Sequence, residues 1–221
     1  MLFKADLHIH TLLSPCASFD MTPKAIVKKA KEIGIDIIGI TDHNSAENVG
    51  VTKKIGEKEG IFVLGGIEAT TKEEVHILAL FGDEKALLSF QKRLYDDIPQ
   101  KNVFGEQVIV DEEDNVLGFN QRLLISATGI SANEMVSLIH SLGGIAIAPH
   151  PERAFGIAFQ LGFIPSELEL DGIEGKGGIA SSDAHFLDDI GLRCTIFDIE
   201  KPSIFELKCA LKDGRYFTTY P

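Results

Sequence analysis

The stretch Ala-Asp-Leu-His-Ile-His-Thr, residues 5–11, is the strongest indication of fold in this chain. It continues an apolar run, so residues 2–9 are predicted to form a strand that ends in a His-x-His pair. Side chains two positions apart on a strand point to the same side, so His8 and His10 can bind one metal ion together. A His-x-His pair alone is more often a pair of surface residues than a metal site. Residues elsewhere in the chain are needed to distinguish these two interpretations.

Beyond this stretch, strand-like and helix-like segments alternate. Thr22 and Pro23 predict the start of a helix that ends at Gly34. Residues 35–42 form a nearly continuous apolar run, typical of a strand buried on both faces. The further strands are predicted at 60–70, 74–81, 143–150, 169–175, 178–185, 194–199 and 215–220, and the further helices at 45–59, 84–97, 132–143, 151–161 and 202–213. Strands separated by helices indicate an α/β fold with a parallel sheet, in which ligands bind at the C-terminal strand ends.

Two segments depart from this alternation. Residues 101–127 contain two short apolar runs around a polar Glu-Glu-Asp-Asn turn, which predicts a β-hairpin insertion in a single domain spanning residues 1–221. In residues 172–180, two predicted strands follow one another with too little chain between them for a helix. Either a helix is missing from the fold at this point, or residues are absent from the sequence.

Composition limits the classes of function. The chain has 221 residues, 44% of them hydrophobic, and three scattered cysteines (Cys16, Cys194 and Cys209), which disfavours a disulfide scaffold. A net charge of -12 disfavours a broad electrostatic contact with duplex nucleic acid, but it allows a nucleotide or a short strand as substrate. No apolar run approaches the roughly 20 residues that cross a bilayer, and charge occurs too early for a secretory signal. We therefore expect a cytoplasmic protein without a membrane partner.

Most of the histidines stand at or near predicted strand ends. They are His8, His10, His43, His76, His150 and His185, accompanied by the acidic residues Asp6, Asp42, Glu68 and Asp183. Each motif alone has an ordinary explanation, such as a helix cap at Asp42. Six histidines at one edge of one sheet are not explained in that way, whereas His140 falls within a predicted helix and is expected to be structural. Imidazoles with carboxylates are ligands for zinc, manganese or iron, and a carboxylate such as Glu68 can bridge two ions.

The order of the motifs resembles the PHP superfamily, the polymerase and histidinol phosphatase group of metal-dependent phosphoesterases. The matching segments are ADLHIHT (5–11), GITDHNS (39–45), GIEAT (66–70), EVHILAL (74–80), IAPHPER (147–153) and ASSDAH (180–185). This resemblance implies a distorted (β/α)7, TIM-like barrel with a metal site at the C-terminal strand ends. It also implies two or three divalent ions, which would be zinc, manganese or iron.

The resemblance assigns ligands residue by residue. The first ion would be held by His8, His10, Glu68 and Asp183, the second by Glu68, His76 and His150, and the third by His43 and His185. Asp6 and Asp42 would orient ligating imidazoles.

The third ion position departs from the family pattern. The family commonly has Ser-Asp-Gly after His-x-His, with the Asp as a ligand, but here the match is Ser14-Pro15-Cys16. Either Cys16 or Asp20 replaces the carboxylate, or the third site is weak or empty. Cys16 is slightly favoured because a thiolate suits zinc or iron, although a loop thiol without a role is nearly as good an explanation.

These assignments predict an enzyme that hydrolyses a small phosphomonoester, such as histidinol phosphate or a nucleotide, by a hydroxide that bound ions activate. Glu68, His185 and Arg153 are the catalytic candidates; Arg153 would bind phosphate oxygens, unless it only forms a surface ion pair. One alternative is a phosphodiesterase or exonuclease on short nucleic acid, and another is a non-catalytic metal-binding domain. Amidohydrolase chemistry would predict a lysine at a strand end, and no suitable lysine is present. The sequence does not determine the substrate, the native metal or the oligomeric state.

Overall fold

The computed structural model describes residues 1–219. In chain order, its strands are β1 (Leu2–Ile9), β2 (Ile37–Ile40), β3 (Phe62–Thr70), β4 (His76–Phe81), β5 (Val108–Val110), β6 (Val116–Phe119), β7 (Ile145–Ala148), β8 (Gly172–Ile173), β9 (Cys194–Asp198) and β10 (Tyr216–Thr219). The α-helices are α1 (Pro23–Glu32), α2 (Val49–Glu59), α3 (Glu84–Tyr95), α4 (Ala132–Ser141), α5 (Ile157–Leu161) and α6 (Ile204–Asp213). Tyr220, the last residue of the strand expected at 215–220, lies outside the described residues.

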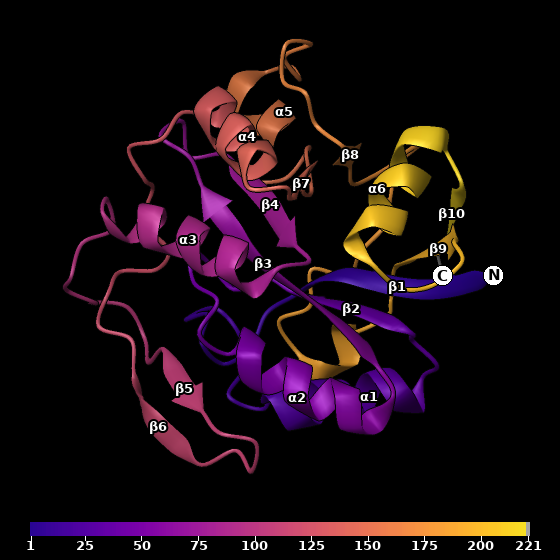
Figure 1. The fold of residues 1–221 in the computed structure, drawn as a ribbon. Coiled ribbons are helices and arrows are strands. Elements are labelled where there is room, and N and C mark those ends of the chain that lie inside the picture. Colours follow the sequence, from indigo (N-terminus) through magenta and orange to yellow (C-terminus); the bar gives the residue numbers. More distant parts are fainter. Residues whose placement is uncertain (220–221) are drawn as a thin grey trace.

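Eight of the described strands form one curled sheet in the order β10-β9-β1-β2-β3-β4-β7-β8, so the expected α/β class is confirmed (Figure 1). The expected parallel arrangement is wrong in part. Strands β1, β2 and β3 are parallel, but β4 runs antiparallel to both β3 and β7, and β9 runs antiparallel to β1 and β10. Only residues 71–75 connect β3 to β4. That connection is too short for a parallel crossover, so the two strands pair antiparallel.

The strand expected at 178–185 is reduced to two isolated bridges. Ile179 pairs with Glu174 and Ala184 pairs with Ile9, both in parallel. This segment therefore lies between β8 and β1, at the open side of the curled sheet. No helix occurs between β8 and Ile179, where Gly175 and Gly177 turn the chain with φ angles of 125° and 87°. Residues 172–180 thus contain no helix, which both explanations of this short connection predict.

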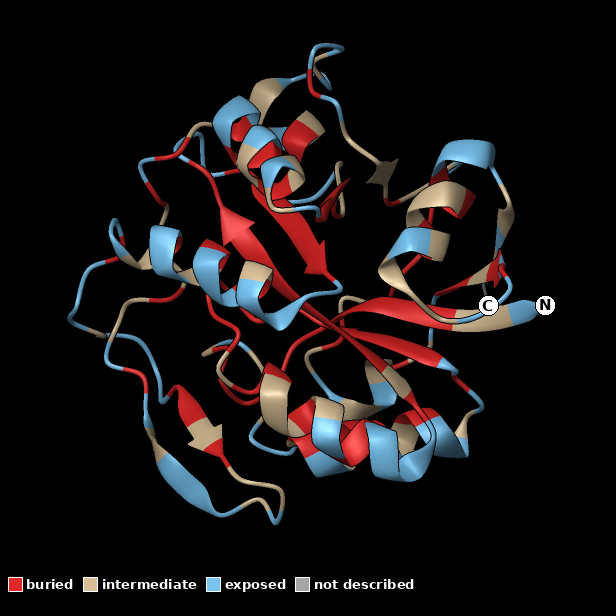
Figure 2. Cartoon of the chain, viewed as in Figure 1, coloured by how far each residue is buried: buried red, intermediate tan, exposed pale blue. Residues whose placement is uncertain are grey.

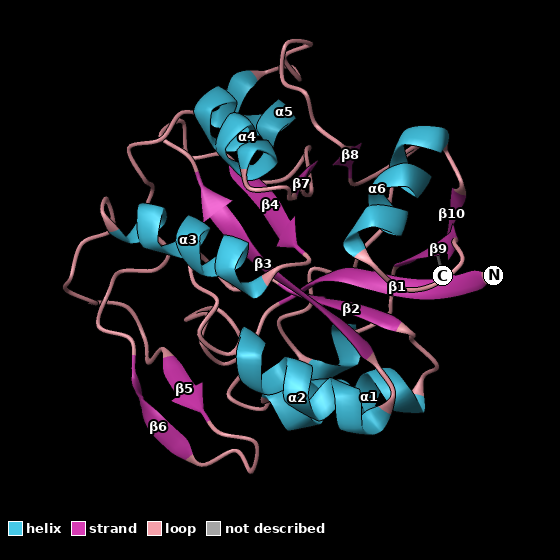
Figure 3. Cartoon of the chain, viewed as in Figure 1, coloured by secondary structure: helices cyan, strands magenta, loops and turns pink. Residues whose placement is uncertain are grey.

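The predicted start of the first helix is confirmed, and the structure also shows a cap at α4. Thr22 Oγ1 accepts a hydrogen bond from the amide of Ala25 at 3.2 Å, and Pro23 occupies the start of α1. In α4, Ser131 and Glu134 form a reciprocal capping box. Figure 3 shows helices α1 to α4 arranged around the outside of the sheet.

The sheet is buried on both faces. The neighbours Ile37 and Ile38 belong to two different hydrophobic clusters, and all four residues of β2 are buried. Figure 2 shows the buried central strands and the exposed outer faces of the helices. A Cβ atom at Gly39 would lie 2.4 Å from the carbonyl oxygen of Leu7, so only glycine permits this close approach of β2 to β1.

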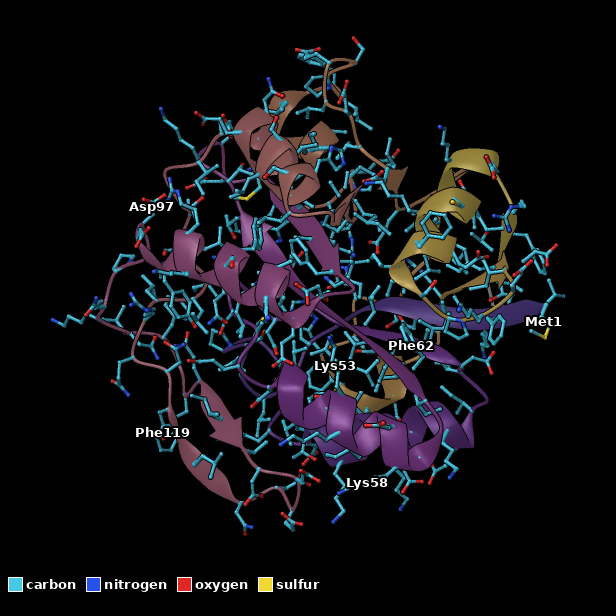
Figure 4. All side chains as sticks on the ribbon, in the orientation of Figure 1. Met1, Lys53, Lys58, Phe62, Asp97 and Phe119 are labelled. Atoms are coloured by element: carbon cyan, nitrogen blue, oxygen red, sulfur yellow. The ribbon has the colours of Figure 1, made fainter. Side chains whose placement is uncertain are left out.

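Strands β5 and β6 form an antiparallel hairpin that extends from the body of the molecule (Figure 1). The Asp111 side chain accepts hydrogen bonds from the amides of Glu113 and Asn115 and so holds its turn. Figure 4 shows Phe119 at the rim of the molecule, on β6. A hairpin is thus present inside the interval 101–127, while the single-domain organisation stays a prediction. None of the helices in residues 1–219 is both long enough and apolar enough to span a bilayer.

Candidate metal centre

The six strand-end histidines meet at one edge of the sheet. Strands β1, β2, β3 and β7 all end at this edge, whereas β4 begins there because it is antiparallel to its neighbours. His76, the first residue of β4, therefore lies beside residues that follow the ends of parallel strands. Ring centroids are 5.1 Å apart for His8 and His10, 4.7 Å for His10 and His43, 5.2 Å for His43 and His76, 5.5 Å for His76 and His150, and 4.3 Å for His10 and His185.

Glu68 lies at the centre of these rings and is 1% exposed. Its Oε1 is 2.8 Å from His76 Nδ1, 3.1 Å from His150 Nε2 and 3.4 Å from His8 Nε2. Its Oε2 is 3.1 Å from His43 Nδ1 and 3.3 Å from His10 Nε2. The two oxygens of one carboxylate thus face two different sets of imidazoles.

Asp183 and His185 reach the same cluster from the segment that follows β8. Asp183 Oδ1 is 3.3 Å from His8 Nε2 and 3.5 Å from His10 Nε2. His185 Nδ1 lies 2.9 Å from the backbone carbonyl of Asp183. Because a carbonyl only accepts hydrogen bonds, Nδ1 carries the proton, and Nε2 of the neutral ring keeps its lone pair.

Several sets of these atoms are close enough to share an ion. Three groups have ligand atoms within 4.8 Å of one another: His8 with His10 and Glu68, His43 with Glu68 and His76, and His10 with His43 and His185. These groups contain five of the six predicted histidines with Glu68, and His150 joins them through its 3.1 Å contact with Glu68 Oε1. The structure places His10 and His43 in two groups each, a sharing that the sequence did not predict.

Burial and neighbouring charges move the pKa values in this site in opposite directions. Burial alone would lower the pKa of His10, but Asp183 and Glu68 raise it to about 9. Burial would likewise raise the pKa of Glu68, but the surrounding imidazoles hold it well below its usual value. The pKa of His43 is lowered well below its usual value by burial. Positive charge on some imidazoles thus balances buried carboxylates, which is the balance that a bound cation supplies.

The hydrogen bonding of the site also fits a metal. His43 Nδ1 lies 3.1 Å from Glu68 Oε2 and forms no hydrogen bond with any described residue. The Nε2 atoms of His8 and His10 face one another at 3.2 Å. Buried polar atoms in proteins normally have partners, so converging atoms with incomplete hydrogen bonding fit a bound ion.

Asp42 acts on the cluster through Ser14. Its carboxylate accepts hydrogen bonds from the Thr11 amide at 2.7 Å, the Thr11 hydroxyl at 2.8 Å and the Ser14 hydroxyl at 2.6 Å. Ser14 Oγ in turn lies 3.0 Å from His10 Nδ1. Asp42 thereby fixes the loop that orients the His10 ring.

Within residues 1–219, Asp6 makes no hydrogen bond or ion pair with an imidazole, contrary to its expected role. Its carboxylate instead accepts hydrogen bonds from the amides of Ser182 and Gly191, each at 2.9 Å. These bonds hold the backbone of the segment that carries Asp183. Burial raises the pKa of Asp6 to about 6.

Arg153 and Cys16 lie at the margin of the cluster. Arg153 Nη2 donates to Asp183 Oδ2 at 2.7 Å, while the Arg153 side chain is 57% exposed. Cys16 and Asp20 are exposed and belong to none of the three groups. Desolvation and the charges of nearby carboxylates, Glu68 among them, raise the pKa of the Cys16 thiol to about 12, so the thiol lies within the electrostatic field of the cluster.

Glu174 is a site residue that the sequence reasoning missed. It is 5% exposed, its Oε2 accepts a hydrogen bond from the His150 amide at 3.1 Å, and its Oε1 lies 3.6 Å from His8 Nδ1. A signal for it exists, because Gly-Ile-Glu occurs both at 66–68 and at 172–174, each time at or near the end of a strand.

Backbone strain is concentrated at the site. Among the described residues, six other than glycine have positive φ angles, and four of them lie at or beside the cluster: Asn44, His150, Phe155 and Asp183. Phe155 also stacks on His76 with ring centroids 4.9 Å apart. Residues in sparsely populated backbone conformations persist only where the surrounding structure holds them. In proteins such residues cluster at active sites and ligand-binding sites.

Comparisons with known proteins show which family this chain is similar to. The PHP domain family matches residues 6–141, and a PHP-associated family matches residues 174–216. An uncharacterized protein of Methanocaldococcus jannaschii is 33% identical over 179 residues, covering 77% of this chain and 80% of that protein. A 5'-3' exoribonuclease of Haemophilus influenzae is 24% identical over 69% of this chain and 70% of its own length.

Solved structures show the same fold. The lesion-specific endonuclease Q of Pyrococcus furiosus superposes with a TM-score of 0.75 at 17% identity, covering 96% of this chain and 56% of that one. A complex of endonuclease Q with a 27-mer duplex that carries an abasic lesion gives a TM-score of 0.73 at 16% identity. This chain thus spans little more than half of those proteins.

Proposed function

Because this chain belongs to the PHP domain family, we propose that it is a metal-dependent phosphoesterase that hydrolyses a small phosphomonoester. One observation carries the proposal. The buried carboxylate of Glu68 has imidazole nitrogens on both oxygens, with His76 and His150 on Oε1 and His10 and His43 on Oε2. A carboxylate shared in this way between two sets of ligands suits a bridge between two ions.

The proposed ligands are those that the family resemblance assigns, and the contacts of Glu68 with His10, His76 and His150 support the first two sets. His8, His10, Glu68 and Asp183 would hold one ion, Glu68, His76 and His150 a second, and His43 and His185 a third. Cys16 is the proposed additional ligand at the third position, with Asp20 as the alternative. Zinc, manganese and iron all accept imidazole and carboxylate ligands, so the donor set does not separate them.

Bound divalent ions would offset the negative charge on the phosphoryl oxygens and would lower the pKa of the attacking water. The residues of the chain would orient the substrate around them. Arg153 is exposed enough to turn from Asp183 towards a phosphate and to bind two of its oxygens with its planar guanidinium group. His185 donates its Nδ1 proton to a carbonyl, which favours a role as an Nε2 ligand over a role as a proton donor.

A phosphodiesterase or nuclease acting on short nucleic acid is the second candidate. It is favoured by the relative described as a 5'-3' exoribonuclease, whose likeness extends over more than two thirds of both chains. The net charge of -12 weighs against an extended contact with nucleic acid. We therefore place the phosphomonoester first.

The test combines elemental analysis with substrate assays. Purified protein would be supplied with manganese or zinc and assayed with p-nitrophenyl phosphate, nucleoside monophosphates and histidinol phosphate, and with bis(p-nitrophenyl) phosphate as the diester. We expect two or three bound ions per chain and metal-dependent release of phosphate from monoesters. Turnover of the diester alone would favour the second candidate. Bound metal without turnover of any ester would indicate a non-catalytic metal-binding domain.

A further inference from the structure

A second cavity lies beside the metal centre. It has a volume of about 700 Å³ and is lined in part by Pro151, Ile164, Leu170, Lys176, Arg193 and Tyr216. A smaller cavity of about 350 Å³ lies over the metal centre and includes Glu68, His76 and His185. His150 and Arg153 line both cavities. The two cavities therefore adjoin at these two residues.

The cavity is bordered by the short connection after β8. Residues 175–178 turn the chain without a helix, and Lys176, Gly177 and Gly178 form part of the cavity wall. Had a helix joined β8 to Ile179, its side chains would need space in this region. The cavity thus lies where the short connection at 175–178 leaves space, and this short connection is already evident in the sequence.

The lining has an apolar side and a rim of hydrogen-bond donors. Ile164, Leu170 and Ile173 supply aliphatic surface, and Tyr216 supplies an aromatic ring. In the described part of the chain, the Lys176 and Arg193 side chains make no hydrogen bond or ion pair, and the Tyr216 hydroxyl makes no hydrogen bond. These groups have donors left for a ligand.

The mixed charge of the cavity wall favours an uncharged aromatic ring as ligand over a second phosphate group. Glu152 and Glu174 also line the cavity, and Arg153 is already paired with Asp183. The wall is therefore of mixed charge, unlike a site built for a second phosphate. A nucleobase has flat apolar faces for the aliphatic side and carbonyl and ring-nitrogen acceptors for the donors at the rim. The volume lies within the range of about 300–1,000 Å³ that small-molecule sites occupy.

We propose that this cavity binds the nucleoside part of the substrate, with the phosphate at the metal centre, so that the substrate is a nucleoside monophosphate. This inference rests on the proposed function for the phosphate only. The cavity itself would recognise a nucleoside without phosphate, and that binding can be measured without any turnover.

The experiment measures binding of adenosine, guanosine, cytidine and uridine by saturation-transfer NMR, followed by calorimetric titration of those that bind. Ile164→Trp would occupy part of the cavity, and Phe163→Trp is its matched control, since Phe163 is 62% exposed and does not line the cavity. Lys176→Ala with Arg193→Ala removes the rim donors, and Lys201→Ala with Lys212→Ala is the matched control on exposed lysines elsewhere. Thermal melts would verify that each variant is folded.

We expect at least one nucleoside to bind the unaltered protein. Ile164→Trp should weaken that binding at least about tenfold because the indole ring occupies part of the cavity, and the double variant at the rim should do so because it removes the charged hydrogen-bond donors. Both controls should bind as the unaltered protein does. Absence of nucleoside binding, or equal binding by all variants, would overturn the inference.

Hydrolysis of p-nitrophenyl phosphate by the unaltered protein separates the two ideas. Hydrolysis without nucleoside binding would leave the phosphoesterase in place and remove the nucleoside site. Nucleoside binding that the cavity variants weaken, without hydrolysis of any ester, would uphold the site and contradict the proposed reaction.

Discussion

Replacing Glu174 tests whether a residue outside the ligand set orients the metal centre. Glu174 Oε1 lies 3.6 Å from His8 Nδ1, while the opposite nitrogen of that ring, Nε2, faces Glu68 and Asp183. A carboxylate beside Nδ1 favours a proton on that nitrogen and leaves Nε2 free to bind an ion. Glu174→Gln removes the charge but keeps an oxygen that can accept from the His150 amide.

The structure separates the effects of two substitutions. Loss of a partner behind a ligating histidine costs roughly 10–100-fold in metal affinity, which is about 1.4–2.7 kcal/mol. We expect Glu174→Gln to show this loss with little change in folding. Glu174→Ala would also leave the His150 amide without its acceptor, which costs about 1–3 kcal/mol of folding stability. For a chain of this length, that cost corresponds to a fall of roughly 2–12 °C in Tm.

The assay is a titration of metal-free protein with zinc and manganese, followed by calorimetry, with thermal melts of the same samples. Glu169→Gln is the matched control, because Glu169 is an exposed glutamate in the segment that leads into β8. Glu174→Asp would test whether a carboxylate restores affinity. Metal affinity of Glu174→Gln equal to that of the unaltered protein would refute the orienting role. A melting temperature of Glu174→Gln as low as that of Glu174→Ala would show that Glu174 has a purely structural role.

Three further predictions concern the metal centre. Glu68→Gln should lower turnover by more than about 100-fold with the fold retained, since a bridging ligand affects catalysis more than an outer partner does; unchanged turnover would exclude a bridge. Adding metal at about 100 times Kd should raise the free energy of unfolding by about 2.7 kcal/mol over that of the metal-free protein. A melting temperature that does not respond to metal or chelator would contradict a metal centre. Cys16→Ala should reduce the number of bound zinc ions or weaken the last one, measured by elemental analysis and titration; full occupancy with unchanged affinity would leave Cys16 without a ligand role.

The arrangement of strands shows where local pattern is a sufficient guide. The apolar run at 35–42 predicts a buried strand, and β2 is buried on both faces as expected. The direction of β4 could not be derived in the same way, because periodicity is the same for parallel and antiparallel strands. The length of the connection at 71–75 was the available signal, and it requires an antiparallel pair.

Residues 178–185 mark the limit of such predictions. Their apolar pattern predicts a strand, but the structure contains only the pairings of Ile179 and Ala184. Several hydrogen bonds of this segment are made with partners far away in sequence, as when the Ala180 amide donates to Thr195 Oγ1 at 2.8 Å. Tertiary contacts replaced the regular ladder that local pattern predicts.

The sequence by itself determined the alternation of elements, the same-side placement of His8 and His10, and the occurrence of histidines and carboxylates at strand ends. These features depend on the periodicity of neighbouring residues, which is local. Only the tertiary structure decided that Glu68 lies between two sets of imidazoles, that Glu174 stands behind His8, and that a large cavity adjoins His150. Those relations depend on which distant segments pack together, and pairing across the sheet sets that packing.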